Sequence, residues 1–472
     1  MTSTGPITAT AAARATLLPG FVGTTLPDWL AARLRDGLAG VCIFGDNIES
    51  REQLRALTDA IREANPDSLI AIDEEGGDVT RLYYAQGAPY PGNALLGRID
   101  DLELTERIGR EVGHELRAVG INLDFGPDVD INSNPDNPVI GVRSFGTGPQ
   151  LVARHSAAWV RGLESTGVAA AAKHFPGHGD TAQDSHLSLP VVDLPIEQLR
   201  ERELLPFASA IGAGSRAIMT SHILLPQLDA ENPATFSSRI LQELLRHELG
   251  FDGVIVSDAL DMVGASGEIG IPAAAVRAIA AGCDLLCIGT ENSDEQLEQI
   301  ELAILDAVAD GSLPEARLRD AAARTSSLGR ALYGTSEVTS SPEPSFDLGA
   351  TAAAFDVAES TVVEPTRTVV AIDTVANIAI GSAPWGPAVD ARMTRGESLP
   401  TVTGQLVLVG RDNHRRDWVR DIIDAARRSH PGTIVVDMGW PSDDRNYADV
   451  ATFGASRHVG QALGAWLEEA VR

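Results

Sequence analysis

One short segment of the chain concentrates residues that can carry out acid–base chemistry. Residues 173–186, KHFPGHGDTAQDSH, contain one lysine, two aspartates and three histidines within fourteen positions. Packing alone does not explain so many ionisable side chains, and binding and catalytic residues concentrate on loops held by rigid scaffolds. We therefore predict that this segment forms part of a functional site.

Asp184 and His186 are the pair in this segment best suited to proton transfer. They lie two residues apart, so Asp184 can orient and polarise the imidazole of His186. A histidine has a reference pKa of about 6.5 and can act first as general acid and then as general base near neutral pH. Asp258 directly follows the run VIVS at 254–257 and can supply a carboxylate nucleophile at the end of a strand. This combination indicates acetal transfer through a covalent intermediate.

Further polar residues follow other predicted strands, and their side chains are directional hydrogen-bonding groups suited to sugar hydroxyls. Each also has a structural interpretation: an aspartate can cap a helix, and an arginine can form a surface ion pair. These residues are Asp73, Arg81, Arg143 and Lys173.

Metal binding is the main competing use of the histidine-rich segment. His174, His178, Asp180 and His186 could coordinate zinc, but the chain has no HExxH motif and no repeated Cys/His pattern. We predict neither a metal nor a cofactor.

The elements that must position these residues are short apolar runs separated by amphipathic segments. Several runs are continuously hydrophobic, which is typical of parallel strands buried on both faces. The predicted strands are 16–21, 39–44, 68–73, 121–125, 168–172, 216–220, 253–257 and 284–288. The predicted helices between them include 104–119, 150–164, 196–212, 237–248 and 294–310.

Eight strand–helix alternations predict a (β/α)8 TIM-type barrel, in which the loops after the strands share the face that holds the active site. A doubly wound sheet is the alternative fold, but it would need a Gly-rich phosphate turn that Gly20 to Gly23 do not form. We predict a barrel over residues 1–333 and a Ser- and Pro-rich linker over 334–349.

A second, smaller α/β domain is predicted over residues 350–472. It has strand-like runs at 368–373, 405–410 and 433–438, and helices are expected at 415–428 and 456–471.

The composition limits the partners. The chain has 37 Lys+Arg against 66 Asp+Glu, a net charge of −29, which argues against nucleic-acid binding. No run approaches the ~20 apolar residues of a membrane span, and the first residues lack the pattern of a signal peptide. Three cysteines without metal spacing are typical of a reducing compartment, so we expect a cytoplasmic enzyme. Lys173 is the only lysine.

Four motifs together resemble glycoside hydrolase family 3. They are KHFPGHGDTAQDSHLSLP (173–190), AIDEEGG with Arg81 (71–81), GVRSFG (141–146) and GFDGVIVSDALDM (250–262). The bacterial β-N-acetylglucosaminidase branch is the most similar, over about residues 15 to 330. The resemblance implies a TIM-type barrel and a carbohydrate substrate.

The resemblance also implies roles for individual residues. Asp258 matches the catalytic nucleophile, and Asp184 and His186 match the acid/base dyad. The residues that match positions holding the non-reducing N-acetylglucosamine are Asp73, Arg81, Arg143, Lys173 and His174. The implied function is that of a retaining exo-β-N-acetylglucosaminidase.

Two residues depart from the family pattern. The family usually has Gln at the position of Glu74 and Arg at the position of Asp78. A charge reversal at Asp78 predicts an altered preference beyond the first sugar. The C-terminal domain matches weakly, so no site residue is assigned to 350–472.

Three other functions remain open from the sequence. A neutral histidine does not repel phosphate, so a phosphorylase could use phosphate in the second step. A non-catalytic sugar-binding protein would be expected to lack the nucleophile or the dyad. A β-glucosidase or β-xylosidase would generally lack the Asp184-Ser185-His186 triplet. The natural substrate, muropeptide or chitin fragment, and the oligomeric state are not determined by the sequence.

Overall fold

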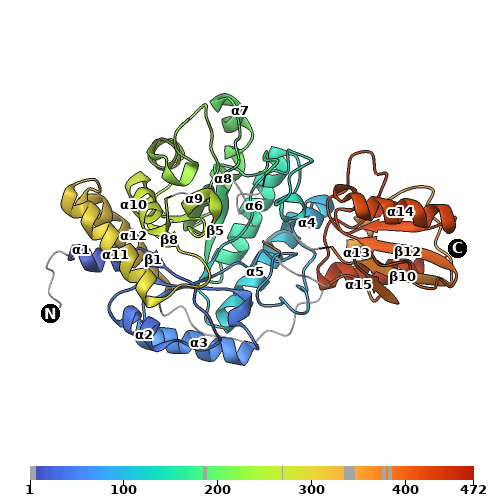
Figure 1. The fold of residues 1–472 in the computed structure, drawn as a ribbon, viewed down its shortest axis with the longest axis horizontal. Helices are drawn as coiled ribbons and strands as arrows, with labels where there is room; N and C mark the ends of the chain where they lie inside the picture. The colour runs from blue at the N-terminus through green and yellow to red at the C-terminus, as the bar shows by residue number, and fades with distance from the viewer. Residues whose placement is uncertain are drawn as a thin grey trace.

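The computed structural model describes residues 7–183, 189–267, 269–333, 346–374, 379–380 and 385–471. These residues form a larger α/β domain and a smaller one that lie side by side (Figure 1).

Eight parallel strands form the centre of the larger domain. Each pairs with the next along the chain, in the order β2-β3-β4-β5-β6-β7-β8-β1. Hydrogen bonds from Ala39 N to Arg14 O (3.1 Å) and from Cys42 N to Pro19 O (2.9 Å) tie β2 to the chain around β1 and close the ring. The predicted TIM-type barrel is confirmed. Its strands are β1 (Leu17–Leu18), β2 (Gly40–Ile43), β3 (Leu69–Ile72), β4 (Leu123–Asp124), β5 (Ala169–Phe175), β6 (Ala217–Thr220), β7 (Val254–Ser257) and β8 (Leu285–Cys287).

Burial on both faces explains why these strands are continuous apolar runs. Every residue of the eight strands is buried. One face of each strand contributes to the barrel interior, and the other packs against the surrounding helices. Seven of the eight predicted runs contain an observed strand in full, and the run 168–172 covers only the first part of β5, which continues to Phe175.

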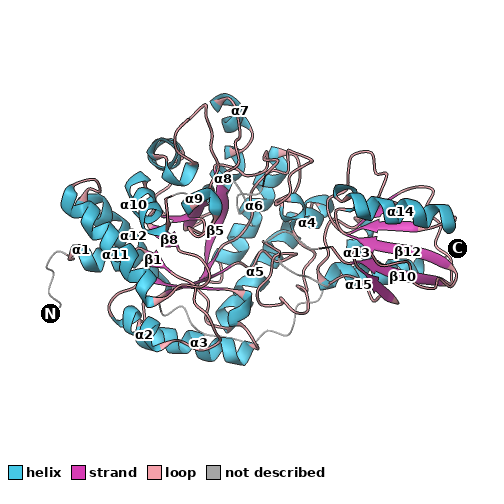
Figure 2. Cartoon of the chain, in the orientation of Figure 1, coloured by secondary structure: helices cyan, strands magenta, loops and turns pink. Residues whose placement is uncertain are grey.

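The helices surround this ring (Figure 2). They are α1 (Ala9–Arg14), α2 (Asp28–Arg35), α3 (Arg51–Ala64), α4 (Asn93–Ile99), α5 (Leu102–Ala118), α6 (Pro149–Glu164), α7 (Ile196–Glu201), α8 (Leu204–Gly212), α9 (Val263–Ser266), α10 (Ile271–Ala281), α11 (Asp294–Asp310) and α12 (Glu315–Leu332). Short 3-10 turns are η1 (Gly45–Asn47), η2 (Gly141–Arg143) and η3 (Ala234–Phe236), and η4 (Arg239–Glu248) is a π-helix.

The single helix predicted over 196–212 is wrong. The chain breaks between α7 and α8, where Arg202 leaves helical geometry at φ −116° and ψ −77°. The guanidinium of Arg202 there contacts Asp180 at 2.6 Å and Glu203 at 2.5 Å. Pro206, in the first turn of α8, has no N–H to donate to Arg202 O, so one helix cannot continue through this point.

The smaller domain is a six-stranded sheet with helices on both faces. Its order is β11-β10-β12-β13-β14-β9, parallel except for β9. Buried residues of α14 pack against one face of this sheet, and buried residues of α15 pack against the other. The elements are α13 (Leu348–Ala353), β9 (Asp356–Val357), β10 (Arg367–Ile372), β11 (Ala391–Met393), β12 (Gln405–Gly410), η5 (Asn413–Arg415), α14 (Asp417–Ser429), β13 (Ile434–Asp437), β14 (Val450–Ala451) and α15 (Arg457–Glu469).

The predicted bounds of the two domains stay a prediction, because most of the predicted linker is not described. The helix α12 ends at Leu332, next to the predicted end of the barrel. Residues 334–345 of the predicted linker lie outside the described residues, and its last residues already begin α13 at Leu348.

Asp78 joins the two domains. Its Oδ1 accepts a hydrogen bond from Ala455 N (2.8 Å), and its Oδ2 lies 3.1 Å from the guanidinium of Arg411. Asp78 is buried at this interface and does not line the barrel cavity. Its departure from the family pattern therefore serves domain contact, and the expected altered preference beyond the first sugar has no support from this position.

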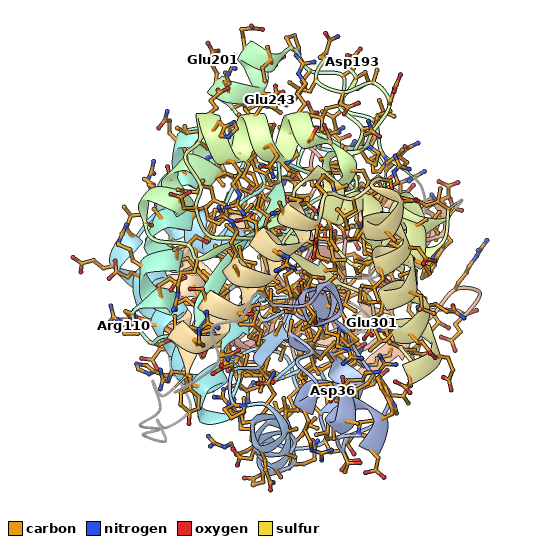
Figure 3. The ribbon with its side chains drawn as sticks, turned by 90° about the vertical axis from the view of Figure 1, so that its left-hand side faces the viewer. Asp36, Arg110, Asp193, Glu201, Glu243 and Glu301 are labelled. Carbon is orange, nitrogen blue, oxygen red and sulfur yellow. The ribbon has the colours of Figure 1, made fainter. Side chains whose placement is uncertain are left out.

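The acidic composition is visible on the barrel surface. Asp36, Asp193, Glu201 and Glu243 are exposed and point outward (Figure 3). Within the described ranges, no helix has both the length and the apolar character needed to cross a membrane.

Candidate active site

The described residues enclose a cavity of about 370 Å³ at the carboxyl ends of the barrel strands. Ligand pockets usually begin near ~300 Å³, so this cavity can hold a single sugar ring. Six of the residues singled out in the sequence line it: Asp73, Arg81, Arg143, Lys173, His174 and Asp258.

Lys173 lies near the end of β5, with its ammonium between two carboxylates. Its Nζ is 2.6 Å from Asp73 Oδ1 and 2.8 Å from Glu75 Oε1. Burial opposes the charge of Lys173, but these two carboxylates outweigh burial and raise its pKa. The only lysine of the chain is therefore a charged, immobilised donor in the cavity wall.

Glu75 is a site residue that the sequence prediction missed. Arg143 donates two hydrogen bonds to Glu75, from Nε to Oε2 at 3.0 Å and from Nη2 to Oε1 at 2.8 Å. Although burial disfavours its charge, Arg143 and Lys173 together lower the pKa of Glu75. Successive side chains of an extended segment point to opposite faces, so Asp73 and Glu75 share the cavity face. That two-residue period was a usable signal for Glu75.

Arg81 connects the barrel cavity to the smaller domain. Its guanidinium lies 3.6 Å from Asp73 Oδ2, and both of its terminal nitrogens donate to Ala379 O at 3.1 Å. Burial would raise the pKa of Asp73, but Lys173 and Arg81 outweigh it and keep the pKa low. Ala379 itself lines the cavity. The smaller domain, to which the sequence assigned no site residue, thus supplies part of the wall.

His174 is held by groups on both sides of its ring. Its Nδ1 lies 2.7 Å from Asp130 Oδ2, and its Nε2 lies 3.3 Å from Arg143 Nη2. Because Asp130 can only accept here when ionised and Arg143 can only donate, we assign the proton to Nδ1 and the lone pair to Nε2. Burial would raise the pKa of Asp130, but His174 and the His178 amide, which donates to Asp130 Oδ1 at 2.6 Å, outweigh it and lower the pKa.

Among the described residues, the set of side chains that could hold a metal ion is Asp128, Asp130 and His174. Arg143 Nη2 lies 3.4 Å from Asp128 Oδ2, and Asp130 already binds the imidazole of His174. A guanidinium so close to a would-be ligand competes with a second cation for it. These residues fit a buried hydrogen-bond network better than a metal centre.

Asp258 follows β7 directly and is half-buried at the cavity. Its Oδ1 accepts a hydrogen bond from Ala259 N at 2.8 Å, and its own amide donates to Thr220 Oγ1 at 3.3 Å. His178 lies close enough for its charge to interact with that of Asp258, but burial lowers the pKa of His178 to about 4 and keeps it neutral. The Asp258 carboxylate thus faces the cavity and is fixed by the Ala259 amide.

Asp184 and His186 lie outside the described residues, so their predicted roles stay predictions. Both ends of the segment that carries them are anchored. Asp180 pairs with Arg202 at 2.6 Å, and Val192 N donates to Leu224 O at 2.9 Å.

Glu74 points away from the cavity and ties the loop after β3 together. Its Oε2 accepts from Thr80 Oγ1 (2.8 Å) and from the amides of Arg81 and Leu82 (both 3.0 Å). Burial raises its pKa to about 7. The folded protein therefore keeps a proton on Glu74 between pH 4.5 and 7 that the unfolded chain has released, so this group costs stability as the pH rises through that window.

Glu74→Gln is expected to stabilise the protein at pH 8 by up to about 3 kcal/mol and to change little at pH 5. The amide oxygen can accept the same three hydrogen bonds without a buried charge. Urea unfolding of both proteins at the two pH values measures this, with Glu63→Gln on the exposed face of α3 as control. An equal loss of stability at both pH values would show that Glu74 is ionised and satisfied in the folded state.

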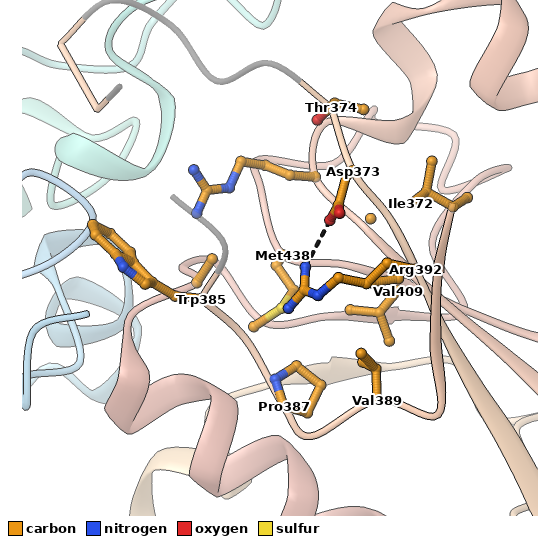
Figure 4. Close-up of a pocket in the computed structure, with 13 residues that line it drawn as sticks. Ile372, Asp373, Thr374, Trp385, Pro387, Val389, Arg392, Val409 and Met438 are labelled. Carbon is orange, nitrogen blue, oxygen red and sulfur yellow. Dashed lines mark hydrogen bonds and ion pairs between the residues drawn. The ribbon is translucent and has the colours of Figure 1, made fainter. Parts of the chain in front are cut away.

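A second hollow lies at the carboxyl ends of the smaller sheet, beside Trp385, Pro387 and Met438 (Figure 4). In it Arg392 pairs with Asp373 at 2.7 Å. Its volume is only about 50 Å³, well below the ~300 Å³ at which ligand pockets begin. The barrel cavity is therefore the candidate site.

The part of the chain that forms the barrel matches a known family. The family model described as "Glycosyl hydrolase family 3 N terminal domain" matches residues 26–328. A beta-hexosaminidase A of Pseudoalteromonas piscicida is 38% identical over 332 residues, which are 65% of this chain and 55% of that protein. The chain thus spans little more than half the length of that relative.

Two further relatives are covered almost completely. A beta-hexosaminidase of Stenotrophomonas maltophilia (strain K279a) is 38% identical over 331 residues, which are 65% of this chain and 97% of that protein. A solved structure of a glycoside hydrolase family 3 beta-N-acetylglucosaminidase from Paenibacillus sp. str. FPU-7 has a TM-score of 0.87 at 30% identity. It covers 99% of this chain, and this chain covers 97% of it, so the similarity includes both domains.

Proposed function

The chain belongs to glycosyl hydrolase family 3, and from that membership we propose that it is a retaining exo-β-N-acetylglucosaminidase. The observation that carries the proposal is a one-sugar cavity in which Asp258 lies together with Lys173, Asp73 and Arg143. The names of the similar beta-hexosaminidases and of the similar beta-N-acetylglucosaminidase support the N-acetyl sugar.

In the proposed reaction, Asp258 attacks the anomeric carbon while His186 protonates the leaving oxygen. His186 then deprotonates a water molecule, which releases the sugar from Asp258 with retained configuration, and Asp184 orients the imidazole. Retaining enzymes usually place two carboxyl groups ~5–5.5 Å apart. Because a histidine replaces one of them, this spacing does not apply. The assignment of Asp184 and His186 as the acid/base dyad therefore depends on the sequence motif.

The cation–carboxylate network is proposed to bind the sugar hydroxyls. Lys173 and Arg143 are held by Asp73 and Glu75, so their remaining N–H groups have defined directions. Fixed donors and acceptors lose little conformational entropy when a sugar binds. The small cavity volume supports exo action, in which one terminal residue enters.

Water is proposed as the acceptor in the second step. Incubation with p-nitrophenyl N-acetyl-β-glucosaminide is expected to give free N-acetylglucosamine at the same rate with and without inorganic phosphate. If N-acetylglucosamine 1-phosphate were the main product in phosphate, the enzyme would be a phosphorylase. The corresponding glucoside is expected to react far more slowly; equal rates on the two substrates would contradict the N-acetyl preference.

The natural substrate is proposed to be a muropeptide released in cell-wall recycling or a short chitin fragment, processed in the cytoplasm. Support for a reducing compartment comes from the three cysteines, all described, buried and unbridged. Rates on an anhydromuropeptide and on chitobiose distinguish the two substrate classes.

A further inference from the structure

One buried histidine has no role in the proposed reaction. His222 lies two residues after the end of β6, and its side chain is fully buried. It does not line the barrel cavity. Because β6 and β7 are neighbours in the barrel, His222 lies next to the chain that leaves β7 through Asp258. Any contribution that His222 makes to catalysis must therefore pass through the protein groups that it contacts.

One nitrogen of the His222 ring holds the peptide that follows Ala259. The Nε2 atom lies 3.0 Å from Ala259 O. A carbonyl oxygen can only accept a hydrogen bond, so we assign a proton to Nε2 as the donor. At the other end of the same planar peptide, Leu260 N donates to Cys287 O at 2.9 Å. The peptide between Ala259 and Leu260 is therefore fixed at both ends.

The other ring nitrogen of His222 connects to the amide of Asp258. Its Nδ1 lies 2.9 Å from Thr235 Oγ1, and that hydroxyl lies 2.8 Å from Thr220 Oγ1. Thr220 Oγ1 in turn accepts a hydrogen bond from Asp258 N at 3.3 Å. The side chains of Thr220 and Thr235 are fully buried, like that of His222. A buried hydrogen-bond network thus runs from the amide of Asp258 to the carbonyl of Ala259.

The two ends of this network flank the peptide that fixes the nucleophile. Asp258 Oδ1 accepts a hydrogen bond from Ala259 N at 2.8 Å. Because the peptides before and after this N–H are both held, the N–H has a defined direction, and so does the carboxylate that it binds. Attack on an anomeric carbon needs reacting atoms that are aligned and about 3–3.5 Å apart, so a small rotation of the carboxylate slows the reaction.

We propose that His222 is a positioning residue that directs the Asp258 carboxylate at the anomeric carbon. It acts through the carbonyl of Ala259 and, by way of the two threonine hydroxyls, through the amide of Asp258. The kinetic consequence rests on the proposed function, whereas the positioning of the carboxylate does not. Loss of His222 is expected to lower kcat and to leave sugar binding unchanged, because Lys173 and Arg143 bind the sugar independently of this network.

Two substitutions separate the two ring nitrogens of His222. The amide nitrogen of glutamine takes the place of Nε2 and can still donate to Ala259 O, whereas that of asparagine reaches only the place of Nδ1. With p-nitrophenyl N-acetyl-β-glucosaminide, His222→Asn is expected to lower kcat by about 10²-fold. His222→Gln is expected to restore most of that loss. Equal losses of kcat in the two variants would overturn the proposal.

Inhibition by N-acetylglucosamine separates positioning from binding. Its inhibition constant is expected to be the same in the wild type and in both variants of His222. A weaker inhibition in His222→Asn with unchanged kcat would show that His222 serves sugar binding, and would contradict the proposal.

His155→Asn is the matched control for the loss of a buried imidazole. His155 is fully buried, and its Nδ1 also contacts a threonine hydroxyl, Thr105 Oγ1 at 2.9 Å. Its Nε2, however, lies 3.1 Å from Asp100 Oδ1, and it does not line the cavity. His155→Asn is expected to lower the stability to urea and to leave kcat unchanged. A loss of kcat as large as that in His222→Asn would mean that any buried histidine has this effect.

Hydrogen exchange tests the positioning without any turnover. The Ala259 amide, which binds Asp258 Oδ1, is expected to exchange faster in His222→Asn than in the wild type or in His222→Gln. Mass spectrometry of peptides that contain Ala259 measures this. The same exchange rate in all three proteins would overturn the proposal. If the exchange differs as expected but the wild type hydrolyses no N-acetylglucosaminide, the proposed function fails and the positioning role stands.

Thr220 covers the case in which a variant of His222 fails to fold. Thr220→Val removes the hydroxyl that accepts from Asp258 N, whereas Thr220→Ser keeps it. We expect kcat to fall by about tenfold in Thr220→Val, the scale of one hydrogen bond, and to change little in Thr220→Ser. Unchanged kcat in a folded Thr220→Val protein would overturn the proposal.

Discussion

Asp258→Ala is expected to lower kcat on p-nitrophenyl N-acetyl-β-glucosaminide by at least about 10⁴-fold, the scale seen when a covalent nucleophile is removed. The carboxylate lies directly after β7, fixed by the Ala259 amide and facing the cavity. The neighbouring His178 is neutral and buried, so it cannot supply the negative charge that the Asp258 carboxylate brings to the attack. Steady-state kinetics measure the loss.

Azide separates a missing nucleophile from a misfolded site. With the carboxylate gone, a small anion can occupy its space and attack the anomeric carbon from the same face, giving the α-glycosyl azide. Recovery of turnover with that product is the expected result for Asp258→Ala. Asp261→Asn, which alters another carboxylate of the same cavity, is the matched control and is expected to lose far less activity. Unchanged kcat in Asp258→Ala would refute the proposed mechanism.

The fold could be predicted because buried parallel strands leave a strong local pattern. Runs such as 68–73 and 253–257 contain β3 and β7. Every residue of these two strands is buried, so their sequences are nearly continuous apolar runs. Burial by distant residues leaves no such pattern. The break at Arg202 was accessible, because Pro206 stands four residues later and cannot donate the hydrogen bond to Arg202 O that one continuous helix would need.

The site likewise contains residues that the sequence could predict and contacts that it could not. Residues that follow strands converge because parallel strands end on one face, which is why Asp73, Lys173 and Asp258 meet in one cavity. Glu75 was accessible to the same reasoning through the two-residue alternation after β3. The contact between Arg81 and Ala379 was not, because the acceptor is a backbone carbonyl 298 positions away. Asp78 likewise finds Ala455 N 377 positions later.

Lys173 is the residue at which composition and structure lead to the same test. Lys173→Met is expected to lower kcat/KM by about 10²- to 10³-fold, as for loss of a fixed donor in an active site. It is also expected to destabilise the fold by about 3–5 kcal/mol, because Asp73 and Glu75 lose a buried partner. Arg81 and Arg143 still neutralise part of that charge, which limits the loss of stability. Kinetics and urea unfolding measure the two effects separately.

Lys173→Arg decides whether the shape of the cation matters as well as its charge. The Lys173 side chain is 3% exposed, and its ammonium bridges two carboxylates at 2.6 and 2.8 Å, a space that fits a compact donor and not a planar fork. We therefore expect a rise in KM and at least a tenfold loss of kcat/KM (about 1.4 kcal/mol) even with the charge kept. Arg110→Lys on the barrel surface is the reverse exchange and is expected to change neither value. An unchanged KM in Lys173→Arg would mean that the only lysine of the chain stands there by chance, and that any cation between Asp73 and Glu75 suffices.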